Sequence, residues 1–428
     1  MLNPYEELES QLRQLELRSS ELLLQGDFEI AEEVANEYVA VAENASDQWQ
    51  SWALLRLGTI LENAGRYEEA AQHAHAAQSL VPIDDPSWNQ AAGLLGNIYF
   101  HQEDYSAAKE QYLHTIDRTS DSSFALCGLS SIEFDLGNFD KARQYALRAL
   151  KFARDVDDRE FMSVAQNLLG DIELELGNRD IAEGHFRNGL AICEELGRRR
   201  GISVACNRLS KIECERKNYV AGLDYGQRFV RAEIEMGRME EVASNSYWIA
   251  FQLDNAEAPE VLQGAIKLCQ TAFREAAKPT ERAWALRQQA RFQEKLEQYD
   301  HAESSLKQAM EDIALSDPEL AMTYGMLGSL QRERERFDAA LESFAQALEL
   351  AEKYQHVEVE LKVHRSLAYC LVKKGKVVLA SRHFQRALEI AELKKDQPAI
   401  THLQDCLEYY KPNCISRIRF WLLGRSRS

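Results

Sequence analysis

The stretch NLLGDIELELGNRDIAEGHF gathers several carboxylates and an imidazole between Asn167 and Phe186. Asp171, Glu173 and Glu175 alternate along the chain, and His185 follows them. Carboxylates beside a histidine are the groups that general acid–base catalysis uses. Whether they form such a site depends on whether the stretch is unique in the chain.

The pattern of this stretch recurs along the sequence. Gly170 is followed by Gly177 and Ala182, and Gly58 is followed by Gly65 at the same offset. Successive copies lie 34 to 40 residues apart. Their first small residues are Ser19, Gly58, Gly96, Ser130, Gly170, Ser210, Ala250, Ala290, Gly328 and Ala368. The carboxylates differ between copies, so we expect them to lie on solvated helix faces and not in an acid–base site.

Each copy reads as a helical hairpin. Apolar residues such as Leu169, Ile172 and Leu176 recur at helical spacing, and a Gly or polar break ends the first helix. Ala and Leu are abundant and Pro is scarce, at 8 residues in 428. One hairpin cannot bury its apolar faces alone, whereas a stack of hairpins can. The sequence therefore predicts an all-α fold of stacked hairpins.

An aromatic residue opens many of the second helices, as at Tyr67, Phe139 and Phe337. With the small residues and alanines, this pattern resembles the tetratricopeptide repeat, here in a lengthened form similar to the repeat regions of bacterial signalling regulators and polarity adaptors. The resemblance implies a right-handed α-solenoid of about nine to ten hairpins. The expected divisions are 1–45 (N-terminal helices and a partial repeat), 46–393 (solenoid), 394–412 (capping helix) and 413–428 (basic aromatic tail).

Composition and motifs exclude several function classes. A net charge of −19 without a basic stripe disfavours binding of nucleic acid, because the acidic protein repels the phosphate backbone. No phosphate loop, GxSxG, HExxH or CxxC motif is present, so neither catalysis nor a cofactor or metal is expected. His364 and His383 have a spacing unsuited to a metal pair on one helix. The eight cysteines behave as small apolar residues, and neither a signal peptide nor a membrane span is evident, so we expect a cytoplasmic protein.

The resemblance implies a concave face lined by the first helices of the hairpins. Counted from the small residue of each copy, the residues at −6, −3, +1 and +4 should point to this concave face. In the C-terminal half these positions gather basic and aromatic residues: Tyr247, Phe251, Trp284, Arg287, Arg291, Arg332, Lys362, Arg365 and Tyr369. Arginine suits carboxylates and aromatic rings anchor apolar groups, which predicts a protein or peptide partner with an acidic segment. Alternatively, these cations pair internally with Glu294, Glu333 and Glu335, or are solvated.

Asn167 and Asn207 occupy equivalent groove positions, where similar families use asparagine to hold a peptide backbone. The carboxylate clamp of chaperone-binding members is not reproduced. The resemblance therefore implies a non-catalytic scaffold or adaptor that binds a partner segment in its groove. The alternative is a regulatory sensor, in which a peptide or small effector binds the groove and modulates a partner.

The tail PNCISRIRFWLLGRSRS interleaves apolar and basic residues outside the repeats. Arg417, Arg419, Phe420 and Trp421 are its candidate docking residues. Three interpretations stay open: the tail caps the last hairpin, docks a partner or this chain, or contacts a membrane surface.

Overall fold

Left-handed turns close the helical hairpins that the sequence predicts. Gly177 has a φ of +82°, which a residue without a Cβ adopts without strain. The N–H of Asn178 donates to the carbonyl of Glu173 at 2.7 Å, and this bond ends the helix in a Schellman turn. Arg159–Glu175 (α9) and Arg179–Leu196 (α10) thereby form one antiparallel hairpin.

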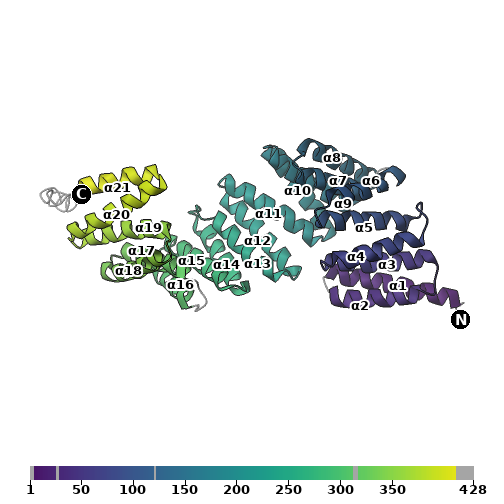
Figure 1. Cartoon of the computed structure of the whole chain (residues 1–428), viewed down its shortest axis with the longest axis horizontal. Coiled ribbons are helices and arrows are strands. Elements are labelled where there is room, and N and C mark those ends of the chain that lie inside the picture. The colour runs from purple at the N-terminus through teal and green to yellow at the C-terminus, as the bar shows by residue number, and fades with distance from the viewer. Residues whose placement is uncertain (1–3, 26–27, 120–121, 312–316, 411–428) are drawn as a thin grey trace. The chain divides into compact units, whose positions relative to one another are not determined.

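The computed structural model describes residues 4–25, 28–119, 122–311 and 317–410, and within these ranges it contains helices and no strand (Figure 1). The predicted all-α solenoid of helical hairpins is confirmed. The chain divides into two units, Met1–Arg216 with Asp224–Arg238, and Lys217–Leu223 with Met239–Ser428. α12 (Tyr219–Glu235) holds residues of both.

The other helices of the first unit are α1 (Pro4–Gln25), α2 (Phe28–Ala42), α3 (Asp47–Asn63), α4 (Tyr67–Leu80), α5 (Pro86–His101), α6 (Tyr105–Thr119), α7 (Ser123–Asp135), α8 (Phe139–Asp155), α9, α10 and α11 (Arg199–Glu215). The other helices of the second unit are α13 (Met239–Gln252), α14 (Pro259–Glu275), α15 (Pro279–Lys295), α16 (Tyr299–Glu311), α17 (Asp317–Glu333), α18 (Phe337–Lys353), α19 (Val357–Lys373), α20 (Val377–Lys394) and α21 (Gln397–Tyr409).

The small residues that mark each copy lie where the two helices of a hairpin approach most closely. A Cβ added at Gly170 would lie 2.5 Å from the ring of Phe186, which is fully buried. At the equivalent position the hydroxyl of Ser130 donates to the backbone carbonyl of Ala142 at 2.9 Å. A small residue is therefore required by packing, and not by chemistry at a site.

The expectation that the carboxylates of the opening stretch face water is wrong for Glu173. Its side chain is 1% exposed and accepts bonds from Arg143 and Asn178, both at 2.8 Å. Burial raises the pKa of Asp171, although Arg208 lies 2.6 Å away and opposes the shift. A carboxylate that satisfies a turn amide and a cation of the preceding hairpin links consecutive repeats. Glu133 and Glu213, both buried, stand at the same offset from Ser130 and Ser210, and this recurrence is the signal that separates Glu173 from the exposed Glu175.

Two further observations concern surface and core. Within the described ranges, none of the helices combines the length and apolar character needed to cross a membrane. The cysteines in these ranges are buried and unbonded to one another, as expected of small apolar residues.

The last hairpin packs a buried histidine, His364, against a half-buried one, His383. The Nδ1 atoms of His364 on α19 and His383 on α20 lie 2.9 Å apart. Burial lowers the pKa of His364 to about 4, with further lowering by His383 and Arg386 and an opposing effect of Glu389. Burial lowers the pKa of His383 as well. The pair is a hydrogen bond that requires at least one neutral ring.

This pair makes the stability of the second unit depend on pH. In the unfolded chain His364 is protonated near pH 6.5. In the folded protein its pKa is lowered to about 4, so it stays neutral down to that pH. Stability present above pH 6.5 is therefore lost as the pH falls, by about 2 kcal/mol between pH 7 and pH 5. Urea denaturation at the two pH values measures this loss.

The first unit offers the matched variant for this experiment. Gln166 stands at the position equivalent to His364 and contacts His185 at 2.7 Å. His364→Gln should keep the contact with His383 and reduce the pH dependence. An unchanged slope would exclude His364 as its source.

Candidate binding groove of the second unit

The first helices of consecutive hairpins pack in series within the second unit. α13 contacts α15, α15 contacts α17, and α17 contacts α19. Because residues three or four apart share a helix face, one face of these four helices forms a continuous surface. We call it the groove.

A cleft of about 520 Å³ opens on α15, α17 and α19. Its floor is apolar: Met326 of α17 packs against the core cluster that contains Leu306, and Met322 against the one that contains Phe344. A Cβ added at Gly325 would meet only the Val363 side chain, at 3.7 Å, so the glycine keeps the middle of the cleft open. Methionine adapts its shape to irregular apolar surfaces, which makes this floor suited to an apolar side chain.

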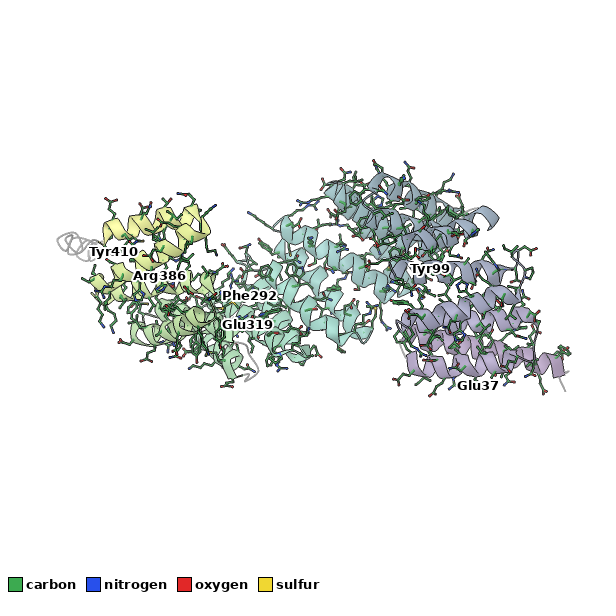
Figure 2. All side chains as sticks on the ribbon, viewed as in Figure 1. Glu37, Tyr99, Phe292, Glu319, Arg386 and Tyr410 are labelled. Atoms are coloured by element: carbon green, nitrogen blue, oxygen red, sulfur yellow. The ribbon has the colours of Figure 1, made fainter. Side chains whose placement is uncertain are left out.

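Arg287 lines the cleft but is engaged inside the protein. It is 8% exposed and donates to the Glu319 carboxylate at 2.5 Å and to the Thr323 hydroxyl at 3.3 Å. Glu319 lies on α17 (Figure 2). The pair therefore joins α15 to α17, and its charge is satisfied without a ligand.

Most of the other predicted groove cations are also paired. Arg291 donates to Asp254 at 2.5 Å, Arg332 contacts Glu333 at 2.7 Å, and Lys362 lies 3.4 Å from Glu358. Of the internal partners that the sequence suggested, only Glu333 is used. In the described part of the chain, half-buried Arg365 makes no ion pair.

Glu294 is the unengaged charged group of the cleft. It is half-buried on α15 and, among the described residues, makes no hydrogen bond or ion pair. Burial raises the pKa of its carboxyl, with a further contribution from Glu333, while Arg291 and Arg332 oppose the shift. A carboxylate in this position favours a cation or a hydrogen-bond donor from a ligand.

Three aromatic rings extend the groove onto α13. The ring centroids of Tyr247 and Phe251 lie 6.4 Å apart, and those of Tyr247 and Trp284 lie 5.9 Å apart. Phe251 is 45% exposed and Trp284 39% exposed. The indole N–H of Trp284 donates to Glu319 at 3.2 Å, which fixes the ring beside the Arg287 pair. The cluster offers an ordered apolar surface.

Tyr369 lies at the other end of the predicted set. Its hydroxyl is 2.7 Å from the His402 ring and 3.4 Å from the Cys406 sulfur, both on α21. The residue ties α19 to the final helix. Asn167 and Asn207 belong to the first unit: Asn167 is 9% exposed with its amide oxygen unpartnered among the described residues, and Asn207 is half-buried. Arg417, Arg419, Phe420 and Trp421 lie outside the described residues.

Sequence reasoning missed the floor of the cleft and its carboxyl. Counted from Gly328, the offsets that give Arg332 also give Met322 and Gly325. Counted from Ala290, the offsets that give Arg291 also give Glu294. Only basic, aromatic and asparagine residues at these offsets were predicted to bind, so the apolar and acidic residues at the same offsets were missed.

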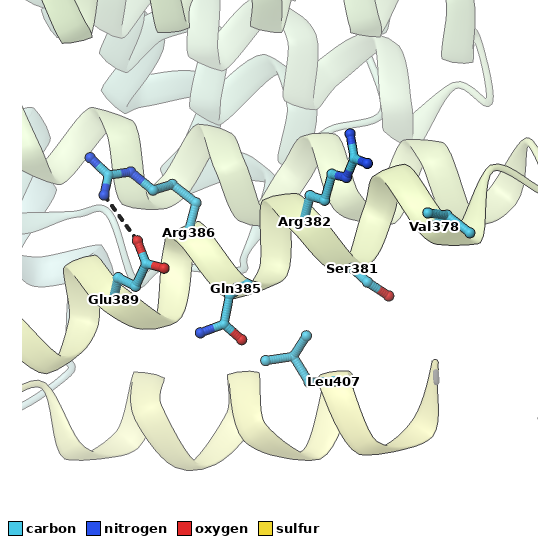
Figure 3. Close-up of a pocket in the computed structure, with 7 residues that line it drawn as sticks. All are labelled: Val378, Ser381, Arg382, Gln385, Arg386, Glu389 and Leu407. Atoms are coloured by element: carbon cyan, nitrogen blue, oxygen red, sulfur yellow. Dashed lines mark hydrogen bonds and ion pairs between the residues drawn. The ribbon is translucent and has the colours of Figure 1, made fainter. Parts of the chain in front are cut away.

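A second hollow, of about 570 Å³, lies between α20 and α21 (Figure 3). Arg382 and Arg386 line it with Glu389, which bonds Arg386 at 3.0 Å. Its lining carries more positive than negative charge.

Comparison with known proteins agrees with the helical-hairpin architecture. The family model described as tetratricopeptide repeat matches residues 121–195, 281–353 and 319–393. No match was found among curated proteins. Solved structures that match part of the chain include MamA, with 18% identity and a TM-score of 0.30, covering 44% of this chain and 94% of that one. Another is pilF of Pseudomonas aeruginosa, with 17% identity and a TM-score of 0.38, covering 66% of this chain and 97% of that one. A Rap protein complexed with competence and sporulation factor also matches, with 17% identity and a TM-score of 0.48, covering 73% of this chain and 88% of that one.

Proposed function

Since tetratricopeptide repeats match residues 121–195, 281–353 and 319–393 of this chain, we propose that it is a non-catalytic scaffold that holds a segment of a partner protein in the groove of its second unit. Repeats of this family are in general protein–protein interaction modules. In this proposal the partner binds the groove, which is formed by the first helices α13, α15, α17 and α19.

The observation that carries the proposal is the open apolar cleft on α15, α17 and α19. Its methionine floor can receive an apolar side chain of a partner. The exposed rings of Phe251 and Trp284 add a second apolar contact on the same face. With Arg287 and Arg291 already paired to carboxylates, apolar contact supplies more of the affinity than charge does.

The experiment is an affinity pull-down with the full chain and a groove variant, Phe251→Ser/Met326→Ser. We expect this variant to lose a partner that the wild type retains, because each change removes an apolar contact worth roughly 1–3 kcal/mol. Circular dichroism verifies that the variant stays helical.

The matched control is Val378→Ser/Leu379→Ser on α20, where the side chains are 58% and 44% exposed. It removes a similar apolar area outside the groove and should retain the partner. A partner that survives the groove changes, or that is lost equally from the control, would contradict the proposal.

A further inference from the structure

We propose that the basic aromatic segment 415–427 of this same chain docks in the cleft of α15, α17 and α19, with its apolar block on the methionine floor and one of its last arginines at Glu294. This inference goes beyond the proposed function and shares only the cleft with it. The tail would be an internal occupant that a partner must displace.

Charge complementarity supports the tail as the occupant. The segment contains Arg417, Arg419, Arg425 and Arg427 and no acidic residue, in a protein of net charge −19. Among the described residues that line the cleft, the Glu294 carboxyl makes no hydrogen bond or ion pair, while the cations are paired with Glu319, Asp254 and Glu358. An added arginine therefore finds a carboxylate that still lacks a partner.

The order of features along the tail matches the order along the groove. A chain leaving α21 toward α15 meets α19 and α17 first, where Val363, Met326 and Met322 form the floor. It meets Glu294 on α15 last. In the tail, the apolar block Ile418–Leu423 likewise precedes Arg425 and Arg427. Each block thus reaches its counterpart without a reversal of direction.

The reach is sufficient. Packed helices lie about 8–10 Å apart, so three steps from α21 to α15 span on the order of 30 Å. The described chain ends at Tyr410, and the segment up to Arg427 extends to about 55 Å. This surplus allows the docked segment to follow the groove without being fully stretched.

The hollow between α20 and α21 is nearer but has the wrong charge. Arg382, Arg386 and Glu389 are among its lining residues, and Figure 3 shows the bond between Arg386 and Glu389. A segment rich in arginine is repelled there. Among the described residues, pairing leaves Arg382 without an ion pair in the hollow and Glu294 without one in the cleft, and this difference favours the cleft.

Photo-crosslinking in the full chain tests the docking. Phe420→p-benzoylphenylalanine places a photoreactive group that attacks nearby C–H bonds, and mass spectrometry of the digested monomer locates the link. We expect a link within one molecule to Met322 or Met326. Glu294→Lys should reduce its yield roughly five-fold, because an attraction becomes a repulsion.

Glu342→Lys, the same charge change at an exposed position of α18 outside the cleft, should leave the yield unchanged. Links to α20 or α21, links between two molecules, or no link at all would each overturn the proposal. The crosslink requires no partner, so it can form even if the pull-down fails. Conversely, a groove-dependent partner with no crosslink would remove the tail from the groove and leave the proposed function standing.

Discussion

Replacing Arg287 with alanine is expected to destabilise the second unit by about 3–5 kcal/mol, because it leaves the Glu319 carboxylate, whose side chain is 14% exposed, without its cation. Arg287 is 8% exposed and bonds both Glu319 and Thr323 across α15 and α17. Urea denaturation followed by tryptophan fluorescence measures the loss, since Trp284 also bonds Glu319.

Arg291→Ala is the matched control for this prediction. Its pair with Asp254 has the same 2.5 Å separation, but the Arg291 side chain is 43% exposed, so its removal should cost about 1 kcal/mol or less. The double variant Arg287→Met/Glu319→Gln should recover most of the stability lost by Arg287→Ala, because no unpaired charge is buried. Equal losses at Arg287 and Arg291 would contradict the account of a buried bridge.

Phe186→Ala is expected to destabilise the first unit by about 3–5 kcal/mol through the cavity it leaves. The ring is fully buried and lies over Gly170, where a Cβ would be only 2.5 Å away. Gly170→Ala alone should also destabilise, by about 1–3 kcal/mol, because the methyl group overlaps the ring. Urea denaturation measures both effects.

The coupling of the two changes tests the packing argument. In the Phe186→Ala background the added methyl of Gly170→Ala fills part of the cavity and should restore stability. Gly184→Ala is the control, because nothing lies within 4 Å of the added Cβ, and it should stabilise α10 by about 0.5–1 kcal/mol. If Gly170→Ala were neutral in the wild type, the small residue would not be explained by close approach.

The architecture could be predicted because it follows from short-range periodicity in the sequence. The small marker, the turn glycine and the apolar spacing of each copy act within one hairpin, as Gly170, Gly177 and Phe186 do. Repetition then supplied many independent copies of the same signal. The buried carboxylate of Glu173 escaped prediction because its partner Arg143 belongs to the preceding hairpin.

The groove was only partly predictable, for a similar reason. Helical offsets placed Arg287, Arg291 and Lys362 along the cleft that the structure contains. They did not reveal that Glu319, Asp254 and Glu358 neutralise these cations. Arg287–Glu319 joins α15 to α17, and Arg291–Asp254 joins α15 to the turn after α13. Such pairing is set by side-chain geometry across repeats.

Hydrogen exchange on the complex with a pulled-down partner tests the central claim most directly. The claim is that a partner segment lies along the first helices of the second unit. Exchange of the full chain would be compared with and without the partner. We expect slower exchange in α15, α17 and α19, with α16, α18 and α20 unchanged. Slowing confined to the first unit, or to the second helices of the hairpins, would contradict the assignment of the groove.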